Sequence, residues 1–372
     1  MFQRILLALV LVCFFGSRPS FGAVVFVAPG AGGEGIQLAL DRLPDGGEVA
    51  LSEGKYLIRE PVILRKDHQT LRGRGVSTVL YLVDAANCPV VVLGSPMANT
   101  KDPIKDVRLA DLLIDGNRAN QQKEVWRLLS DGAGVYNNGV DVWGTDHATV
   151  ENVVCSHCRS GGMVTSAGTR GLAVRGFTAF DNQFDGLACY LTEDSDFSGL
   201  NLHDNLSAGI SLDLDFNHNV IHDAVLTGND LGVFMRQSRN NVFAVLTIQE
   251  SRHHGVFLAQ TFAETGSGWQ PCPGSECTGN NFNNILIAHC GGNAFLVNDA
   301  TCTNNVICGG RFADNALGDL AQASPNLVAM INLATRGKLP QLDAVITAVH
   351  QLTGHVSDIQ SAPESPVISP LR

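Results

Sequence analysis

Glycine recurs at intervals of 23 or 24 residues through the middle of this chain, at Gly162, Gly186, Gly209, Gly232 and Gly255. After each glycine come a short apolar run, polar turn residues and a second apolar run. The repeating units span 140–162, 163–186, 187–209, 210–232, 233–255, 256–293 and 294–318. A repeat of this length predicts a solenoid, because one unit cannot bury its apolar face alone. No unit contains a helical half or a leucine ladder, so the pattern favours an all-β, parallel β-helix.

Within each unit, the first and third positions after the glycine are apolar. Alternate residues of a strand face opposite sides, so these two columns should stack inside the coil. A polar column precedes the second strand of each unit, and it comprises Asp196, Asn219, Asn241, Asn281 and Asn305. Asparagine and aspartate accept turn dihedrals and bond locally, which predicts a stacked ladder. Each repeated glycine should close a coil where little room remains for a side chain.

The two ends of the chain differ from the repeats. Residues 1–23 read as a secretory leader, with a basic start at Arg4 and an apolar run that is too short to span a membrane. A short amphipathic helix is expected near Ile36–Leu43, where it could cap the open end of the solenoid. The β-helix domain should occupy 24–318. Residues 319–372 should form a C-terminal helix, "LPQLDAVITAVHQLTG", and a flexible tail.

The charge balance limits the partners. The formal net charge is −11, and it becomes −13 once Arg4 and Arg18 leave with the leader. An acidic protein has no general attraction for nucleic acid, so no nucleic-acid partner is expected. No other segment resembles a membrane span. The sequence therefore predicts a secreted or periplasmic protein, and any acidic ligand would need a local cationic site.

Nine cysteines remain after the leader, and an oxidising compartment would permit disulfides. Cys272 and Cys277 lie in one irregular segment, Phe262–Gly279, which should loop out from its coil with these two residues bonded. Cys155 and Cys158 form a second close pair, for which a zinc site is the weaker interpretation. Cys189 occupies an apolar column and is expected to be a buried free thiol.

The fourth position of each unit supplies the candidate site, because its side chains should face outward in neighbouring coils. Tyr190, Asp213 and Arg236 stand there in succession, and Trp143 stands two coils before Tyr190. Neighbouring strands lie about 4.8 Å apart, so these residues should form one ladder. Two positions further along, Thr192 and Asp215 are expected on the same face. An aromatic ring, a carboxylate and a guanidinium in adjacent rungs suit an extended polysaccharide.

The N-terminal stretch with "PDGG" and "SEGK", together with "LLIDGNR" at 112–118, resembles the pectin-lyase-like, right-handed parallel β-helix superfamily. The coils from 186 to 236 resemble those of mannuronan C5-epimerases. The resemblance implies lyase- or epimerase-type chemistry on a uronate, whose carboxylate Arg236 would neutralise. Tyr190 would act as acid or base if Arg236 lowered its pKa, and Asp213 would orient Arg236 or the sugar.

One departure from the epimerases concerns their catalytic Asp-Pro-His motif, since this chain has "MVTSAGTRG" in the corresponding coil. The "RHHG" at 252–255 resembles the His-Gly of β-helix polygalacturonases, without that family's partner motifs. Many polyuronate enzymes use Ca²⁺, and Glu193, Asp194 or Asp215 could bind it here, although no acidic motif is specific and no firm metal site is expected.

Two alternatives to uronate chemistry remain open. Asp213 and Asp215 would lie about 7 Å apart if they shared one strand face. That separation would suit an inverting glycoside hydrolase, in which a water molecule fits between acid and base. An exported solenoid could equally bind glycan without catalysis, as a surface scaffold. Product analysis on alginate, pectate and neutral glycans would separate the three functions.

Overall fold

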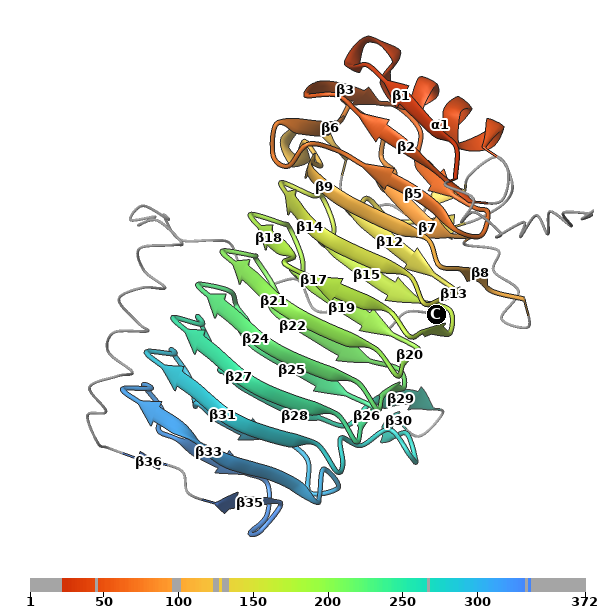
Figure 1. Cartoon of the computed structure of the whole chain (residues 1–372). Coiled ribbons are helices and arrows are strands. Elements are labelled where there is room, and N and C mark those ends of the chain that lie inside the picture. Colours follow the sequence, from red (N-terminus) through yellow and green to blue (C-terminus); the bar gives the residue numbers. More distant parts are fainter. Residues whose placement is uncertain are drawn as a thin grey trace, which may run out of the picture.

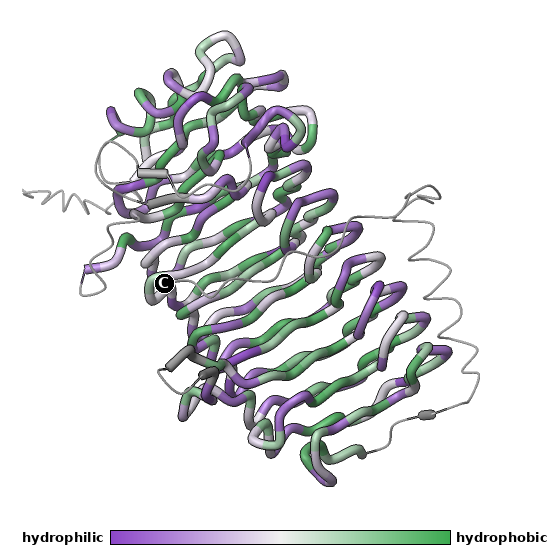
Figure 2. The backbone as a smooth tube through the Cα atoms, turned by 180° about the vertical axis from the view of Figure 1, so that it is seen from behind, coloured by the Kyte–Doolittle hydropathy of each residue, from purple (hydrophilic) through white to green (hydrophobic). Residues whose placement is uncertain are grey.

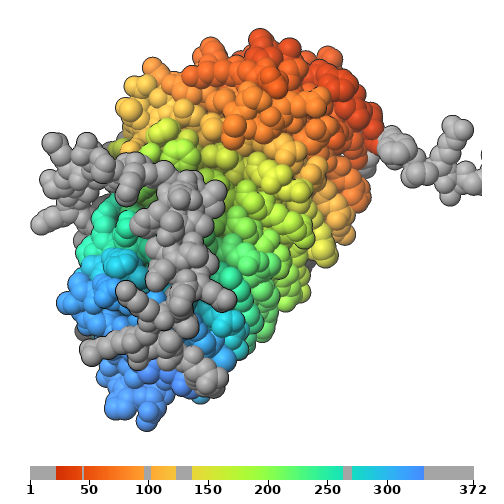
Figure 3. Space-filling view, turned by 60° about the vertical axis from the view of Figure 1, so that its left-hand side comes forward, coloured from red at the N-terminus to blue at the C-terminus, as the bar shows by residue number. Residues whose placement is uncertain are grey.

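The computed structural model describes residues 22–43, 46–95, 102–122, 127–128, 134–265, 268–331 and 334–335. The predicted leader and the predicted C-terminal helix both lie outside these residues. The described chain winds into a right-handed parallel β-helix whose coils stack in sequence order (Figure 1). In the space-filling view, the chain advances steadily from one end of the elongated body to the other (Figure 3).

Three parallel sheets form the sides of the solenoid. The 16-stranded sheet contains β1 (Val24–Val27), β2 (Gly47–Leu51), β3 (Gly54–Ile58), β5 (Gln69–Arg72), β6 (Thr78–Leu82), β9 (Arg108–Asp115), β14 (Thr149–Ser156), β17 (Ala173–Arg175), β18 (Thr178–Phe180), β21 (Asp196–His203), β24 (Val220–Thr227), β27 (Val242–Gln249), β31 (Asn281–Ala288), β33 (Asn305–Ala313), β35 (Val328–Ile331) and β36 (Ala334–Thr335). The ten-stranded sheet contains β4 (Val62–Leu64), β7 (Val91–Gly94), β12 (Val140–Trp143), β15 (Met163–Ser166), β19 (Leu187–Tyr190), β22 (Ala208–Asp213), β25 (Leu231–Arg236), β28 (Val256–Ala259), β32 (Phe295–Val297) and β34 (Leu320–Gln322). The six-stranded sheet contains β8 (Ile104–Lys105), β13 (Thr145–Asp146), β16 (Thr169–Arg170), β20 (Thr192–Glu193), β23 (Phe216–Asn217) and β26 (Ser238–Arg239).

The remaining described elements are short. Two antiparallel hairpins join β10 (Arg127–Leu128) to β11 (Gly134–Val135) and β29 (Phe262–Thr265) to β30 (Gly268–Pro271). The 3-10 helices η1 (Pro29–Ala31) and η2 (Arg118–Asn120) flank the early coils. The β-helix was predicted to end at residue 318. It continues beyond that residue, because β34, β35 and β36 add further parallel strands.

The predicted N-terminal helix is confirmed as α1 (Gly32–Arg42), which lies across the first coils at one end of the solenoid (Figure 1). Ile36 and Leu40 are four residues apart, so they share one face of the helix, and both are completely buried. Glu34 in the first turn and Arg42 in the last turn complement the helix dipole. The helix therefore covers apolar surface that would otherwise face water at the open end.

Tight packing explains the repeated glycines. They occupy equivalent positions at or just before the start of successive strands of the ten-stranded sheet, since Leu187 pairs with Ile210, and Val233 pairs with both Ile210 and Val256. A methyl group on Gly186 would lie 2.9 Å from the Gly209 carbonyl oxygen. The five predicted glycines thus stand at equivalent turns, and the close approach of the next coil excludes a side chain there.

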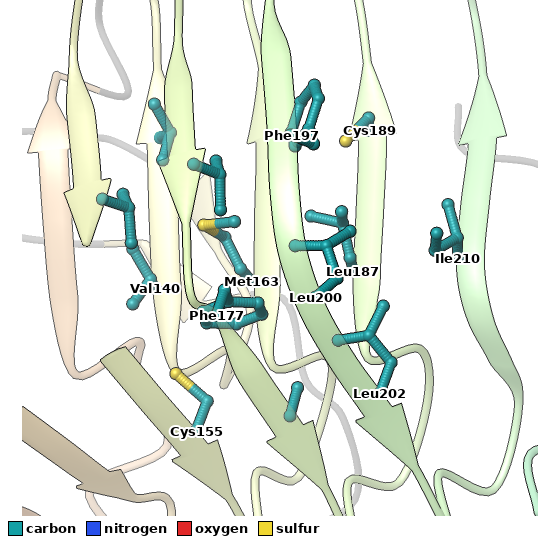
Figure 4. Packing of buried hydrophobic residues seen from close by; sticks show 14 of the residues in the cluster. Val140, Cys155, Met163, Phe177, Leu187, Cys189, Phe197, Leu200, Leu202 and Ile210 are labelled. Atoms are coloured by element: carbon teal, nitrogen blue, oxygen red, sulfur yellow. The ribbon is translucent and has the colours of Figure 1, made fainter. Parts of the chain in front are cut away.

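The solenoid interior is apolar along the strands, while polar residues gather at the corners (Figure 2). Figure 4 shows the stacking directly: Val140, Met163, Leu187 and Ile210 follow one another in successive coils, and Cys189 points into the same core. Cys189 is completely buried and free, as predicted.

Two buried asparagine ladders line the corners of the coil. In the first, Asn219, Asn241, Asn280 and Asn305 are bonded in series, and each side-chain oxygen accepts from the backbone N–H of the preceding rung. The predicted polar column corresponds to this ladder, but two of its members were assigned one residue too far along the chain. Ser195 is in the ladder where Asp196 was predicted, and Asn280 is in it where Asn281 was predicted. The second ladder, which the sequence pattern missed, consists of Asn182, Asn205 and Asn229.

The predicted insertion forms the β29–β30 hairpin, which projects beside the six-stranded sheet (Figure 1). Cys272 and Cys277, which spacing predicts to be bonded, are both free in this structure and lie in different surroundings. Cys277 has already returned into the coil, where it is fully buried, whereas Cys272 lies half-exposed at the base of the hairpin. The two thiols therefore lie in different environments, because the chain re-enters the solenoid between them.

Candidate functional site

Three of the predicted site residues lie in adjacent rungs on the outer face of the ten-stranded sheet. Tyr190 ends β19 directly opposite Asp213, the last residue of β22. Arg236 ends β25, the next strand, since Leu212 pairs with Met235 there. Their strand neighbours Cys189, Leu212 and Met235 belong to the core. Alternation therefore directs the three site side chains away from the interior.

Asp213 and Arg236 form an ion pair that is largely withdrawn from solvent. The Arg236 Nη2 donates to Asp213 Oδ2, and the side chains are 5% and 25% exposed for Asp213 and Arg236 respectively. Asp213 Oδ1 accepts from the Leu214 backbone N–H at 2.8 Å. The Arg236 guanidinium also lies 5.2 Å from the centre of the Phe234 ring. The pKa of Asp213 is raised because burial outweighs the attraction of Arg236.

Tyr190 keeps its proton. Burial is the main reason that its pKa is raised, and the negative charges of Asp185 and Asp213 add to the effect. Arg236 acts in the opposite direction but does not prevail, so the expectation that it would lower the pKa of Tyr190 is wrong. Tyr190 can therefore donate a hydrogen bond or a proton on this face, and it is not suited to be a base.

Asp185 joins this face as a residue that the repeat analysis overlooked. It stands directly before Gly186, and its Oδ1 accepts from the Ala208 backbone N–H at 2.9 Å. Burial, reinforced by the charge of Asp230, raises its pKa to about 6, although Ser207 hydrogen-bonds to it and opposes the shift. Its charge acts on Tyr190, so the two groups belong to one electrostatic cluster. The sequence does contain a signal for this residue. The position before the repeated glycine is apolar in the next two coils, at Ala208 and Leu231, but is an aspartate here.

Two other predicted residues are not placed as expected. Leu191 and Leu214 follow the strand ends with φ of 47° and 48°, which breaks the alternation of side chains. Thr192 consequently points into the solenoid, where it is fully buried and its hydroxyl lies 2.7 Å from that of Thr165. Asp215 also has a left-handed φ, 65°, and lies in the turn beyond β22.

Trp143 is placed on the expected sheet, at the end of β12. It pairs with Ser166 of β15, the strand that precedes β19. Its ring is half-buried and packs partly against the apolar core. Trp143 therefore extends the outer face by two rungs beyond Tyr190, on the side away from Asp213 and Arg236.

The acidic residues considered for calcium are already engaged or isolated. Glu193 and Asp194 both pair with Arg170, at 2.5 and 3.5 Å. Among the residues that the structure describes, no three His, Cys, Asp or Glu side chains gather as metal ligands. In the same part of the chain, no helix is long and apolar enough to cross a membrane.

A third carboxyl on this face makes a pH test possible. Asp141 of β12 is 6% exposed and accepts one hydrogen bond, at 2.8 Å, from Asn138 Nδ2. Burial raises its pKa from 3.8 to about 7. The folded state therefore binds a proton more tightly than the unfolded state, and this carboxyl makes stability fall as pH rises between about 4 and about 7.

We expect Asp141→Asn to raise the free energy of unfolding at pH 8 by on the order of 2 kcal/mol, and to change it little at pH 4. Urea unfolding at both pH values measures the difference. Glu53→Gln, at an exposed carboxyl, is the matched control and should have nearly the same effect at both pH values. An equal effect of Asp141→Asn at both pH values would show that this carboxyl ionises normally.

Comparison with known proteins agrees with the architecture. Residues 67–245 match the family model described as "NosD: Periplasmic copper-binding protein (NosD)". No curated protein matches the chain at a significant level. The pre-mature bacteriophage phi29 gene product 12 has a similar structure (TM-score 0.54, 11% identity, 78% of this chain and 42% of that chain). So does Geobacillus virus E2 ORF18 (TM-score 0.51, 13% identity, 84% and 61%).

The Azotobacter vinelandii mannuronan C-5 epimerase AlgE6 A-module is a more distant likeness, with a TM-score of 0.47 at 17% identity over 82% of this chain and 96% of that module. Identities this low speak to the fold alone. That fold is a right-handed parallel β-helix with three parallel sheets and one N-terminal helix.

Proposed function

We propose that this protein binds an extended polysaccharide along the outer face of its ten-stranded sheet and acts on uronate residues by lyase- or C5-epimerase-type chemistry. The observation that carries the proposal is the succession of Tyr190, Asp213 and Arg236 in adjacent rungs. Strand spacing of about 4.8 Å lets neighbouring sugars of one chain meet neighbouring rungs. Trp143 extends the same face and offers an aromatic surface to a sugar ring.

Each group on this face has a role in that chemistry. Arg236 gives up part of its hydrogen bonding to Asp213 and binds the uronate carboxylate instead. It thereby stabilises the enolate that forms when C5 loses its proton. Asp185, with a pKa of about 6, accepts that proton. Tyr190 donates a proton, either to the departing O4, so that a C4–C5 double bond forms, or to the opposite face of C5. The first outcome is a lyase reaction and the second is an epimerisation.

The place of action that fits is outside the cytoplasm, secreted or periplasmic. Residues 1–23 have the pattern of a secretory leader, and the matching family model is described as periplasmic. The polysaccharide would then be an extracellular or periplasmic polymer.

A second candidate is glycan binding without catalysis, and the Asp213–Arg236 pair favours it. Asp213 already compensates the charge of Arg236, and Asp141, Asp185 and Asp213 leave the face with more carboxyls than cations. The hydrolase alternative has less support. Its proposed acid and base do not share a strand, because β22 ends at Asp213 and left-handed residues follow.

The deciding experiment incubates the protein with alginate, pectate and a neutral glycan. Ultraviolet absorbance of an unsaturated uronate indicates a lyase, and altered proton NMR without absorbance indicates an epimerase. Tyr190→Phe and Asp185→Asn should each lower turnover by at least about 100-fold. Tyr81→Phe, on the other sheet, is the matched control and should leave turnover unchanged. Binding without any product would support the glycan-binding alternative and overturn the catalytic one.

A further inference from the structure

Cys277 and Cys302 form a buried thiol pair between two successive coils. Cys277 lies where the chain re-enters the coil after the β29–β30 hairpin, and Cys302 lies in the turn between β32 and β33. Both are completely buried. The Cys277 backbone N–H donates to the Cys302 sulfur at 3.4 Å, and the Cys277 thiol donates to the Ala259 carbonyl at 3.5 Å.

We propose that Cys277 and Cys302 form a disulfide when the protein folds in an oxidising compartment. The contact between the Cys277 backbone N–H and the Cys302 sulfur carries the proposal, because it already brings the two residues together across neighbouring coils. The proposal is independent of the glycan chemistry above. It also replaces the Cys272–Cys277 bond that spacing alone predicts.

The chemistry needs a disulfide donor, for which oxidised glutathione suffices. The Cys302 thiolate attacks one glutathione sulfur, forms a mixed disulfide and releases one reduced glutathione. The Cys277 thiolate then attacks the Cys302 sulfur and releases the second. Two cysteines are oxidised, one glutathione disulfide is reduced, and the protons of both thiols pass to the released thiolates. Because both thiols are completely buried in the folded protein, this exchange takes place while the coils are still closing.

The bond would hold the base of the hairpin against the next coil. Neighbouring contacts already bring these segments together, since Thr278 Oγ1 donates to the Thr303 carbonyl at 2.7 Å. Cys272 lies on the hairpin side of this junction, where its backbone N–H donates to the Thr261 carbonyl at 2.8 Å. A Cys277–Cys302 link would close the loop between these residues, which restricts the unfolded chain and stabilises the fold.

Disulfide mapping tests the proposal on the full chain. The protein is refolded with oxidised glutathione, blocked with an alkylating reagent and cut after Glu276 and Asp299, and then by chymotrypsin after Phe282 and Leu286. Chymotrypsin also cuts after Trp269 and Phe312, so Cys272 lies in 270–276, Cys277 in 277–282 and Cys302 in 300–312. Cys308 shares the last peptide, so the map is repeated with Cys308→Ser.

We expect 277–282 to be linked to 300–312 in the wild type, in Cys308→Ser and in Cys272→Ser, and the link to be absent from Cys302→Ser. Reductant should lower the melting temperature of the wild type by roughly 5 °C and leave that of Cys302→Ser unchanged. A link between Cys277 and Cys272, or alkylation of both Cys277 and Cys302 after oxidation, would overturn the proposal. The wild-type map decides the question even if Cys302→Ser does not fold.

Discussion

Replacing Arg236 by alanine is expected to lower the free energy of unfolding by about 3–5 kcal/mol at pH 8, because it leaves Asp213 charged and without its partner. Asp213 is 5% exposed, and it would keep the hydrogen bond from the Leu214 backbone N–H. Its pKa, already raised by burial, should rise further once Arg236 is gone. The cost should therefore shrink as pH falls and Asp213 takes up a proton. Urea unfolding at pH 8 and pH 5 measures both effects.

Two variants show whether the buried charge is the cause. The double variant Asp213→Asn with Arg236→Ala removes that charge and should recover at least half of the loss. Arg170→Ala breaks an exposed pair with Glu193, where Arg170 is 57% exposed, and should cost less than about 1 kcal/mol. If the single and double variants lose equal stability at both pH values, lost packing on Phe234 is the cause instead.

The same pair decides how activity is to be tested. Because Arg236→Ala is expected to destabilise the fold, lost turnover in that variant would not by itself identify a substrate contact. Arg236→Lys keeps the charge beside Asp213 but loses the planar fork that binds a carboxylate at two points. We expect the Arg236→Lys protein to fold and to bind a neutral glycan as the wild type does. Its turnover on a uronate polymer should be lowered at least about 10-fold.

Replacing Asn241 by alanine is expected to destabilise the protein by about 3 kcal/mol or more, because the first asparagine ladder loses its middle rung. Asn241 is fully buried. Its Oδ1 accepts from the Asn219 backbone N–H at 3.0 Å, and its Nδ2 donates to the Phe216 carbonyl at 2.9 Å. Both partners would be left buried and unpaired. Thermal and urea unfolding measure the loss.

Asn241→Asp is a sharper variant of this test. It preserves the size of the side chain and the acceptor for Asn219, but it brings a negative charge against the Phe216 carbonyl and Asn280 Oδ1. It should be at least as destabilising as alanine. Asn283→Ala, at a half-buried residue of the neighbouring β31 with none of the ladder bonds, should cost less than about 1 kcal/mol. If the variants at Asn241 and Asn283 lose equal free energy of unfolding, the ladder bonds do not contribute specially to stability.

The sequence by itself determined the architecture, because the features involved are local and recur in every coil. The glycine period, the two apolar columns and the spacing of Ile36 and Leu40 specify a β-helix with an N-terminal helix. The stacked column that contains Tyr190, Asp213 and Arg236 follows from the same period, since residues at equivalent positions of successive coils must become neighbours.

Only the tertiary structure decided what those neighbours do. Left-handed residues at Leu191 and Leu214 turn Thr192 inward and take Asp215 off the strand, and counting alternate residues cannot show this. The raised pKa of Tyr190 and the place of Asp185 beside it depend on burial and on charges from several coils. Cys277 meets Cys302 and not its near neighbour Cys272 because the chain re-enters the coil between the hairpin and the next turn. Such effects depend on distances across stacked coils and on removal from water, and neither is a property of a single repeat.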